Sequence, residues 1–514
     1  MDELRIGWAS RDVSTDKPIN IPGQFHMRIS QGIMDPLTVS TLVVDNGSDL
    51  VVFLSADLVV IRSGLLDDVR AKVAELNPGI PVEKILMNAT HTHTGASHYA
   101  DGGSDAAKDN NISTALPAEV PHEGVEIASG DEYRDFLSSQ AAEAIREAYL
   151  TRAPGGIAYG YGYAVVSHSR RVVYFDDTSQ RQGAVVNSMH GVNGNAVMYG
   201  DTSDDQFSHY EAGADHFVNL LYTFDAAGTL TGAIINVPCP SQNSESEYKL
   251  SADYWHDVRT AIRQRHGDIF ILPQCAAGGD LAPRILHYKQ AQARRFKLKY
   301  GVEKTELAAR KDIAERVAAS FSEVLDWAQK DIKTALPVSH VVETVDLSRR
   351  LITDEEYQYA VEGLAELNQK PFRTEGGPAA RLQENSRLAA GRNRFIRIID
   401  RYKLQQTQPK LPMELHVLRI GDLAFASNRF ELYMDFQHRM QARSPFEQTF
   451  IVQLAGQPGM DGGTYLCTER GAQGRGYSAS MFCNVASPQG GQELVEETVR
   501  ILKALHAVDT PPVQ

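Results

Sequence analysis

Two histidines, His91 and His93, stand one residue apart in residues 89–95, ATHTHTG, directly after the apolar stretch 82–88. In extended backbone, residues two apart point to the same side of the chain, so both imidazoles can reach one ligand. Open α/β sheets also bind their ligands just beyond the carboxyl ends of strands. His-x-His therefore indicates a metal or acid–base site, and two ordinary loop histidines are the alternative.

A second segment, residues 273–283 with the sequence PQCAAGGDLAP, is rich in glycine and follows a predicted strand. Glycines at such a turn let the backbone approach a substrate and expose N–H groups that can stabilise an oxyanion. Asp280 in this turn is a candidate to orient a ligand or bind substrate, and capping the following turn is its alternative role. A plain strand-to-helix turn explains the segment about equally well.

The elements that must position these groups begin with residues 50–61, LVVFLSADLVVI, an apolar and β-branched run that predicts a strand covered on both faces. A helical pattern over 63–76 and another strand over 82–88 follow. This order predicts an α/β unit with a parallel pair of strands.

Further along, the pattern predicts a strand over 230–237, a helix around 254–264 capped by Ser251 or Asp253, a strand over 269–272, helices within 285–332 and 354–405, and a final helix over 491–506. We therefore expect a mixed, largely parallel α/β sheet with flanking helices. One large domain over residues 1–514, with a helical insertion at about 285–405, is the predicted organisation.

The composition excludes several classes of protein. Lysine and arginine number 51 against 65 acidic residues, a net charge of −14, which disfavours a nucleic-acid partner. No apolar run approaches the roughly 18 to 20 residues of a membrane-spanning helix, and the first residues lack the apolar core of a secretory signal. We expect a soluble protein, with its compartment and oligomeric state left open. The four cysteines are predicted to be free, buried thiols.

Several segments resemble the neutral, non-lysosomal ceramidases. ATHTHTG resembles the THTHSG motif of that superfamily, SADY at 251–254 resembles SADYPG, and GDLAP at 279–283 resembles GDVSP. Residues 430–432 and 463–466 are similar to its C-terminal metal-binding part. The resemblance spans residues from about 5 to 505 and implies the fold of the catalytic domain, without the additional C-terminal immunoglobulin-like domain.

The resemblance implies a zinc ion held by His91, Glu431 and Tyr465, with His93 beside the metal to stabilise or protonate the reacting group. Imidazole and carboxylate are good zinc ligands, and an open coordination position lowers the pKa of bound water toward about 7. The reaction implied is hydrolysis of an N-acyl bond.

Two positions depart from the family pattern. Pro240, in residues 236–241, stands where relatives have a ligand histidine, and Ala282 stands where they have the serine considered the nucleophile. An alanine methyl group cannot attack a carbonyl, so a metal-bound or base-activated water must do so. Candidates for the lost ligand, or for contacts with substrate, are His190, His216, His256 and Asp253.

Because of these departures, we do not predict that ceramide itself is the substrate. The expected activity is a zinc-dependent hydrolysis of an N-acyl bond in a small polar substrate, because residues 191–211 are rich in hydrogen-bonding side chains. A glycoside or ester hydrolase of the same fold is one alternative. A non-catalytic ligand-binding protein, which has lost the nucleophile and a metal ligand, is the other.

Overall fold

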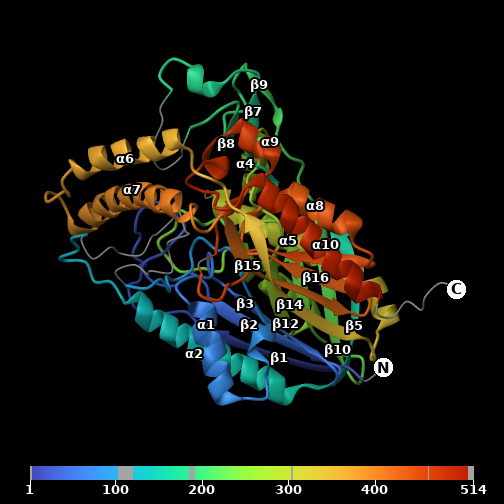
Figure 1. Cartoon of the computed structure of the whole chain (residues 1–514). Coiled ribbons are helices and arrows are strands. Elements are labelled where there is room, and N and C mark those ends of the chain that lie inside the picture. Colours follow the sequence, from blue (N-terminus) through green and yellow to red (C-terminus); the bar gives the residue numbers. More distant parts are fainter. Residues whose placement is uncertain (1–2, 102–119, 185–191, 302–304, 461, 508–514) are drawn as a thin grey trace.

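The computed structural model describes residues 3–101, 120–184, 192–301, 305–460 and 462–507. Two β-sheets lie face to face, and helices cover the outer face of each, so the chain forms four layers (Figure 1). The apolar side chains between the sheets include Phe53 and Phe425, whose ring centroids are 5.0 Å apart. The sequence pattern identified strands but did not separate them into two sheets.

The larger sheet has the strand order β12-β11-β10-β5-β1-β2-β3-β4. Its strands are β1 (Arg5–Asp12), β2 (Thr38–Asp45), β3 (Leu50–Ala56), β4 (Ile85–Ala89), β5 (Ala153–Tyr163), β10 (Phe217–Asp225), β11 (Leu230–Val237) and β12 (Phe270–Cys275). The predicted mixed α/β class is confirmed. The parallel pairing, however, is limited to the two ends of this sheet, β3 with β4 and β11 with β12, and the pairs between them are antiparallel.

Side chains of the larger sheet alternate between two apolar cores. In β2, Leu42 and Val44 face the other sheet, whereas Val39 and Val43 face helices. This alternation is the two-residue period of a strand buried on both sides. Helices α1 (Leu65–Leu76) and α2 (Gly130–Thr151) cover one half of the outer face, and α3 (Tyr254–His266) and α5 (Thr305–Ala328) cover the other.

The smaller sheet has the order β14-β15-β16-β18, with β14 (Val338–Ser348), β15 (Lys410–Ile420), β16 (Leu423–Ser427) and β18 (Gln448–Val452). Its outer face is covered by α8 (Met434–Arg443) and α10 (Pro488–Ala507). Helices α6 (Asp354–Asn368) and α7 (Pro378–Leu404) pack against each other beyond the end of this sheet and contribute to the same apolar cluster (Figure 1). The predicted helical region of 285–405 is therefore not continuous. The strand β14 interrupts it, because its β-branched residues pair along β15 over the whole strand.

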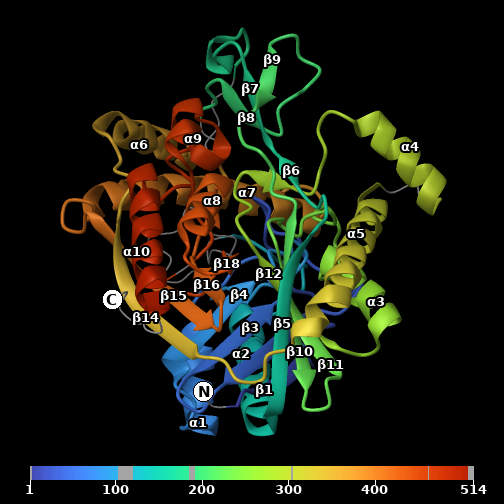
Figure 2. The ribbon, with the colours of Figure 1, turned by 90° about the vertical axis from the view of Figure 1, so that its right-hand side faces the viewer.

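Short elements at one end of the sheets position the polar residues discussed below. They are β6 (His168–Ser169), β7 (Arg171–Tyr174), β8 (Ala196–Met198), β9 (Phe207–Tyr210), β13 (Leu281–Ala282), β17 (Glu431–Leu432), β19 (Tyr465–Leu466), α4 (Lys289–Tyr300), α9 (Glu469–Gly474) and the 3-10 turns η3 (Thr178–Gln180) and η5 (Tyr477–Ala479). The 3-10 turns η1 (Val82–Lys84) and η4 (Gln329–Asp331) lie at the other end of the larger sheet. Figure 2 shows β7, β8 and β9 standing beyond the end of the larger sheet.

Cys239, Cys275, Cys467 and Cys483 are all buried and free, as predicted. Among the residues placed by the structure, no helix combines the length and apolar character needed to cross a bilayer.

Candidate active site

Residues from opposite ends of the chain meet in one pocket of about 80 Å³. His91 Nε2 lies 3.4 Å from Glu431 Oε2, and both side chains are buried. His93 and Tyr465 line the same pocket. The structure therefore brings together all three predicted zinc ligands and the histidine predicted to lie beside them.

His91 stands two residues beyond the carboxyl end of β4, as the motif predicts, but its backbone is not extended. Its φ of 64° is in the left-handed region, so the predicted extended geometry is wrong at this residue. The two imidazoles are nevertheless adjacent, edge to face, with ring centroids 4.8 Å apart. His91 Nδ1 donates to the Val59 carbonyl at 2.6 Å, because a carbonyl can only accept, and Nε2 faces the pocket.

His93 is held from two directions. Its backbone N–H donates to the Ser241 carbonyl, and its Nδ1 lies 3.4 Å from Glu245 Oε2. Its Nε2 lies 3.4 Å from His91 Nε2. Burial, together with the positive charges of Arg28 and other neighbours, lowers the pKa of His93 well below its ordinary value, so the imidazole is neutral at pH 7.

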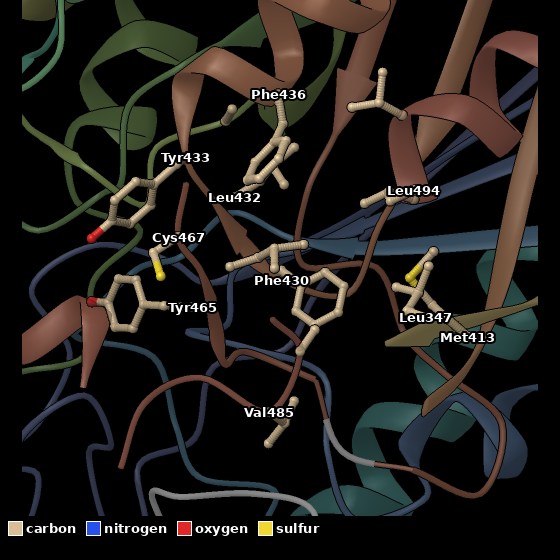
Figure 3. Close-up of a cluster of buried hydrophobic side chains, with 14 of the residues drawn as sticks. Leu347, Met413, Phe430, Leu432, Tyr433, Phe436, Tyr465, Cys467, Val485 and Leu494 are labelled. Atoms are coloured by element: carbon tan, nitrogen blue, oxygen red, sulfur yellow. The ribbon is translucent and has the colours of Figure 1, made fainter. Parts of the chain in front are cut away.

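Glu431 and Tyr465 are directly opposite each other in the parallel pair β17–β19, which explains why their side chains share one pocket. The Gly279 N–H donates to the Leu432 carbonyl at 2.8 Å, and a Cβ at Gly279 would lie 2.3 Å from the Glu431 carbonyl oxygen. The glycine-rich turn is therefore needed for close backbone contact with β17. Figure 3 shows Tyr465 at the border of an apolar cluster, with its hydroxyl directed away from Phe430 and Leu494.

Arg170, which the sequence patterns did not single out, is buried behind this pocket. Its Nη2 donates to the Tyr465 hydroxyl at 3.1 Å and to the Gly279 carbonyl at 3.0 Å, and lies 3.4 Å from Glu431 Oε2. Its Nη1 donates to the Tyr199 hydroxyl at 3.3 Å. Arg170 lies outside every motif and is adjacent to the pocket only because β6 pairs with β13, so no local signal could have identified it.

The charge states follow from these contacts. Burial raises the pKa of Glu431, but His91, Arg170 and the Tyr465 hydroxyl outweigh it, so the pKa is lowered and the carboxylate is ionised at pH 7. Burial lowers the pKa of Arg170, yet Tyr465, Tyr199 and Glu431 raise it well above its ordinary value. Burial raises the pKa of Tyr465 well above 10, so this side chain is a neutral phenol in the absence of another cation.

These donors suit a divalent cation. Zinc bonds of about 2.0–2.2 Å in a tetrahedral site put two ligand atoms about 3.3–3.6 Å apart, and His91 Nε2 and Glu431 Oε2 are 3.4 Å apart. The bond from His91 Nδ1 to a carbonyl is the usual outer contact of a metal-binding histidine. In the described part of the chain, no group of three or more His, Cys, Asp and Glu side chains is arranged to hold a metal. A zinc site here would therefore have to take Tyr465 as a further ligand.

Asp280 is not in the pocket. Its Oδ1 accepts the Met434 N–H at 3.0 Å at the start of α8, so it caps that helix, and burial raises its pKa to about 7. Asp253 is also a capping residue. It accepts the N–H of Tyr254, the first residue of α3, and Oδ2 accepts the Ser244 N–H at 2.6 Å. Neither carboxylate lines the pocket described here.

The histidines considered as substitutes are not among the residues that line the pocket. His216 is exposed just before β10, and His256 is partly exposed in the first turn of α3. His190 lies outside the described residues. Ala282 is buried in β13 and pairs with His168 of β6, so the turn is folded without the serine side chain.

Comparison with known proteins agrees with this architecture. No protein-family model matches the chain, and no curated protein matches it in sequence. Among solved structures, the neutral ceramidase from Pseudomonas aeruginosa matches 100% of this chain and 76% of its own, with a TM-score of 0.66 and 18% identity. A ceramidase complexed with C2 matches 100% of this chain and 77% of its own, with a TM-score of 0.64 and 16% identity. Over its whole length, therefore, this chain has the neutral ceramidase fold.

Proposed function

We propose that this protein hydrolyses an amide bond of the N-acyl type in a small polar substrate. The observation that carries this proposal is the meeting of His91, His93, Glu431 and Tyr465 in one pocket, within a fold shared with a neutral ceramidase. Side chains that can bind a metal ion would allow water to be activated, and a neutral imidazole beside them can transfer the proton, as amide hydrolysis by water requires.

In the proposed reaction, water is the nucleophile because Ala282 offers no hydroxyl. His93 Nε2 accepts a proton from the water as its oxygen attacks the carbonyl carbon. The carbon–nitrogen bond then breaks, and His93 returns the proton to the leaving nitrogen, so one water yields an acid and an amine. The Tyr465 hydroxyl accepts a hydrogen bond from Arg170, and the positive charge of this buried guanidinium favours the negative charge that develops on the carbonyl oxygen.

His91, Glu431 and Tyr465 are the residues that would hold a zinc ion. When bound, zinc would supply positive charge that polarises the carbonyl and acidifies water. Arg170 helps to fix the two oxygen ligands in place, because it contacts both Glu431 and Tyr465. Zinc content is directly measurable: we expect about one zinc per chain in purified protein and loss of the metal in His91→Ala.

The pocket limits the substrate. Its volume is about 80 Å³. Phe25, Tyr99 and Tyr477 are among its walls. We propose that this narrow, partly aromatic space receives the reacting group of a small substrate.

The experiment is a panel of chromogenic substrates that contains amides with short and long acyl groups, esters and glycosides. We expect short N-acyl amides to be cleaved at least tenfold faster than long-chain amides, with loss of the activity after chelation and in His93→Ala. Cleavage of the glycosides or esters but not of the amides would contradict the proposed amide hydrolysis and favour the corresponding alternative. No turnover, combined with a melting temperature that neither chelator nor zinc changes, would indicate a ligand-binding protein.

A further inference from the structure

A second cavity, of about 390 Å³, lies among the residues of β7, β8 and η3, in the part of the chain that stands beyond the end of the larger sheet (Figure 2). This volume is within the roughly 300–1,000 Å³ of small-molecule sites in proteins. More than half of the residues that line the cavity belong to 192–204, within the polar segment 191–211. Among the described residues, the cavity shares no lining residue with the candidate active site.

One wall of this cavity is Tyr199, which is 36% exposed. Its φ of 56° is in the left-handed region, an uncommon conformation for an aromatic residue. The Tyr199 N–H donates to the Arg170 carbonyl at 2.6 Å, and the Tyr199 hydroxyl accepts a hydrogen bond from Gln242 Nε2 at 2.6 Å. The surrounding structure therefore holds Tyr199 in a strained conformation, and strain of this kind is concentrated at functional sites.

A second tyrosine of the lining, Tyr174, is also fixed. Its hydroxyl donates to the Asp201 carbonyl at 3.0 Å, and a Cβ at Gly200 would lie 2.5 Å from that hydroxyl oxygen. Gly200 therefore lets the turn after β8 approach Tyr174 closely. Arg181 lies over the Tyr174 ring, with Cζ 4.9 Å from the centroid, and pairs with Asp204 at 2.6 Å. These contacts preform the cavity, so a ligand would bind without having to order its walls.

Polar groups of the lining can still bind a ligand. Asp201 Oδ1 accepts hydrogen bonds from the N–H and the hydroxyl of Ser203. Within the described part of the chain, Asp201 Oδ2 and the side-chain amide of Asn193 form no hydrogen bond, and both residues line the cavity. An amide offers two donors and an acceptor, and a carboxylate offers acceptors only. The lining therefore suits a ligand that can both donate and accept.

The charged groups of the cavity disfavour an anionic ligand. Among the described lining residues, Arg181 is the one cationic side chain, and it is already paired with Asp176 and Asp204. Asp201 adds a further carboxylate to the lining. A phosphate or carboxylate ligand would meet repulsion here with no available cation. Hydroxyl groups donate and accept hydrogen bonds without carrying a charge, so they fit the same lining.

We infer that this cavity binds a neutral sugar ring. The C–H face of a sugar can pack on the aromatic wall at Tyr199, while its hydroxyls bond to Asn193 and Asp201. Binding of this kind needs neither His93 nor a metal ion, so it goes beyond the proposed hydrolysis and does not depend on it.

The test is calorimetric titration of the full chain with glucose, galactose, mannose and xylose, which are neutral and contain no amide. We expect saturable binding of at least one of these sugars. Asn193→Ala should weaken it at least about fivefold and Tyr199→Ala at least about tenfold, because they remove hydrogen-bonding groups and the aromatic wall. Asn368→Ala on α6 and Tyr288→Ala before α4 are the matched controls, since both residues are exposed outside the cavity, and they should bind like the unmodified chain.

Circular dichroism checks that each variant is folded, and Asn193→Ala decides the result if Tyr199→Ala is not. No binding of any of these sugars, or equal affinity in Asn193→Ala and the unmodified chain, would overturn the inference. Loss of sugar binding in His93→Ala but not in Asn193→Ala would place the sugar in the candidate active site and would also overturn it. Inorganic phosphate should not compete with the sugar, and competition would contradict the preference for a neutral ligand. The titration contains no amide substrate, so failure of the proposed hydrolysis would leave its result unchanged.

Discussion

At the scale of single residues, the buried charges of the pocket balance in pairs. Arg170 is positive and Glu431 negative, whereas the lowered pKa of His93 and the raised pKa of Tyr465 keep both of these side chains neutral at pH 7. A buried charge is costly unless it is compensated, so removal of one partner is worse than removal of both. The residues of this site should therefore show strong thermodynamic coupling.

His93→Gln tests the role of the imidazole. We expect kcat to fall by about 10²- to 10⁴-fold, since glutamine cannot carry the proton between water and the leaving nitrogen. The melting temperature is measured alongside, because His93 is largely buried, with 13% of its side chain exposed. Steady-state kinetics on the best amide of the panel checks this, and a loss of less than tenfold would show that another group moves the proton.

Glu431→Gln tests the charge balance. The substitution leaves the Arg170 guanidinium buried without its carboxylate, so the free energy of unfolding should fall by about 3 kcal/mol. Adding Arg170→Met should recover part of that loss. Urea unfolding measures all three proteins, with Glu147→Gln as control, since its pair with Arg11 is partly exposed and contributes about 1 kcal/mol or less. If the losses in unfolding free energy of the two substitutions simply added in the double variant, the ion pair between Glu431 and Arg170 would be contradicted.

At the scale of elements, the pocket depends on short strands that meet beyond the ends of both sheets. The pair β17–β19 presents Glu431 and Tyr465 together, and the turn before β13 packs against β17. The pair β6–β13 carries Arg170 to the same place. Each of these strands has only two residues, so backbone contacts between them fix the positions of the side chains.

Gly279→Ala tests that packing. Its new Cβ would lie 2.3 Å from the Glu431 carbonyl oxygen, so the turn and β17 must separate. We expect a loss of about 1–3 kcal/mol in the free energy of unfolding and a weaker affinity for zinc, because Glu431 moves. Gly213→Ala is the control, since a Cβ there meets nothing within 4 Å. Calorimetric zinc titration and urea unfolding check both variants, and equal behaviour of the two would refute the argument.

At the scale of the whole molecule, acid should destabilise the fold through buried neutral histidines. His98 is fully buried and its Nε2 accepts the Arg62 backbone N–H at 3.1 Å. Burial and the nearby Arg62 and Arg134 lower the pKa of His98 to about 3. The unfolded chain protonates this histidine near pH 6.5 and the folded chain does not. Stability from this group is therefore complete above about pH 6.5 and is lost as pH falls toward 3.

The expected size of this effect is about 2 kcal/mol between pH 7.5 and pH 5, from about 1.4 kcal/mol for each unit of pH below 6.5. In His98→Gln, whose amide oxygen can still accept the Arg62 N–H, the drop between these pH values should shrink by that amount. Urea unfolding at both pH values measures it, with His122→Gln as the exposed control. An unchanged drop in His98→Gln would show that His98 is already protonated in the folded chain.

Much of the architecture could be predicted from local pattern. The strand over 230–237 coincides with β11, and the predicted β3–α1–β4 unit has its parallel pair. These elements could be predicted because the spacing of apolar residues along the chain shows which side chains are buried in a helix or a strand. The antiparallel centre of the larger sheet and the separate second sheet could not be read in this way, because strand pairing depends on contacts between distant residues. The same limit explains β14, which lies between the two predicted helical segments, 285–332 and 354–405, and was not predicted as a strand.

For the site, residue types and their positions along the chain indicate which side chains could bind a metal or move a proton, namely the His-x-His motif, Glu431 and Tyr465. Folding of the chain brings them into one pocket, makes Asp280 and Asp253 helix caps, and buries Arg170 behind Glu431 and Tyr465. The physical reason is that an ion pair or a hydrogen bond depends on distances of a few ångströms between residues that lie hundreds of positions apart. Those distances are produced by packing and leave no mark in the local pattern of residues.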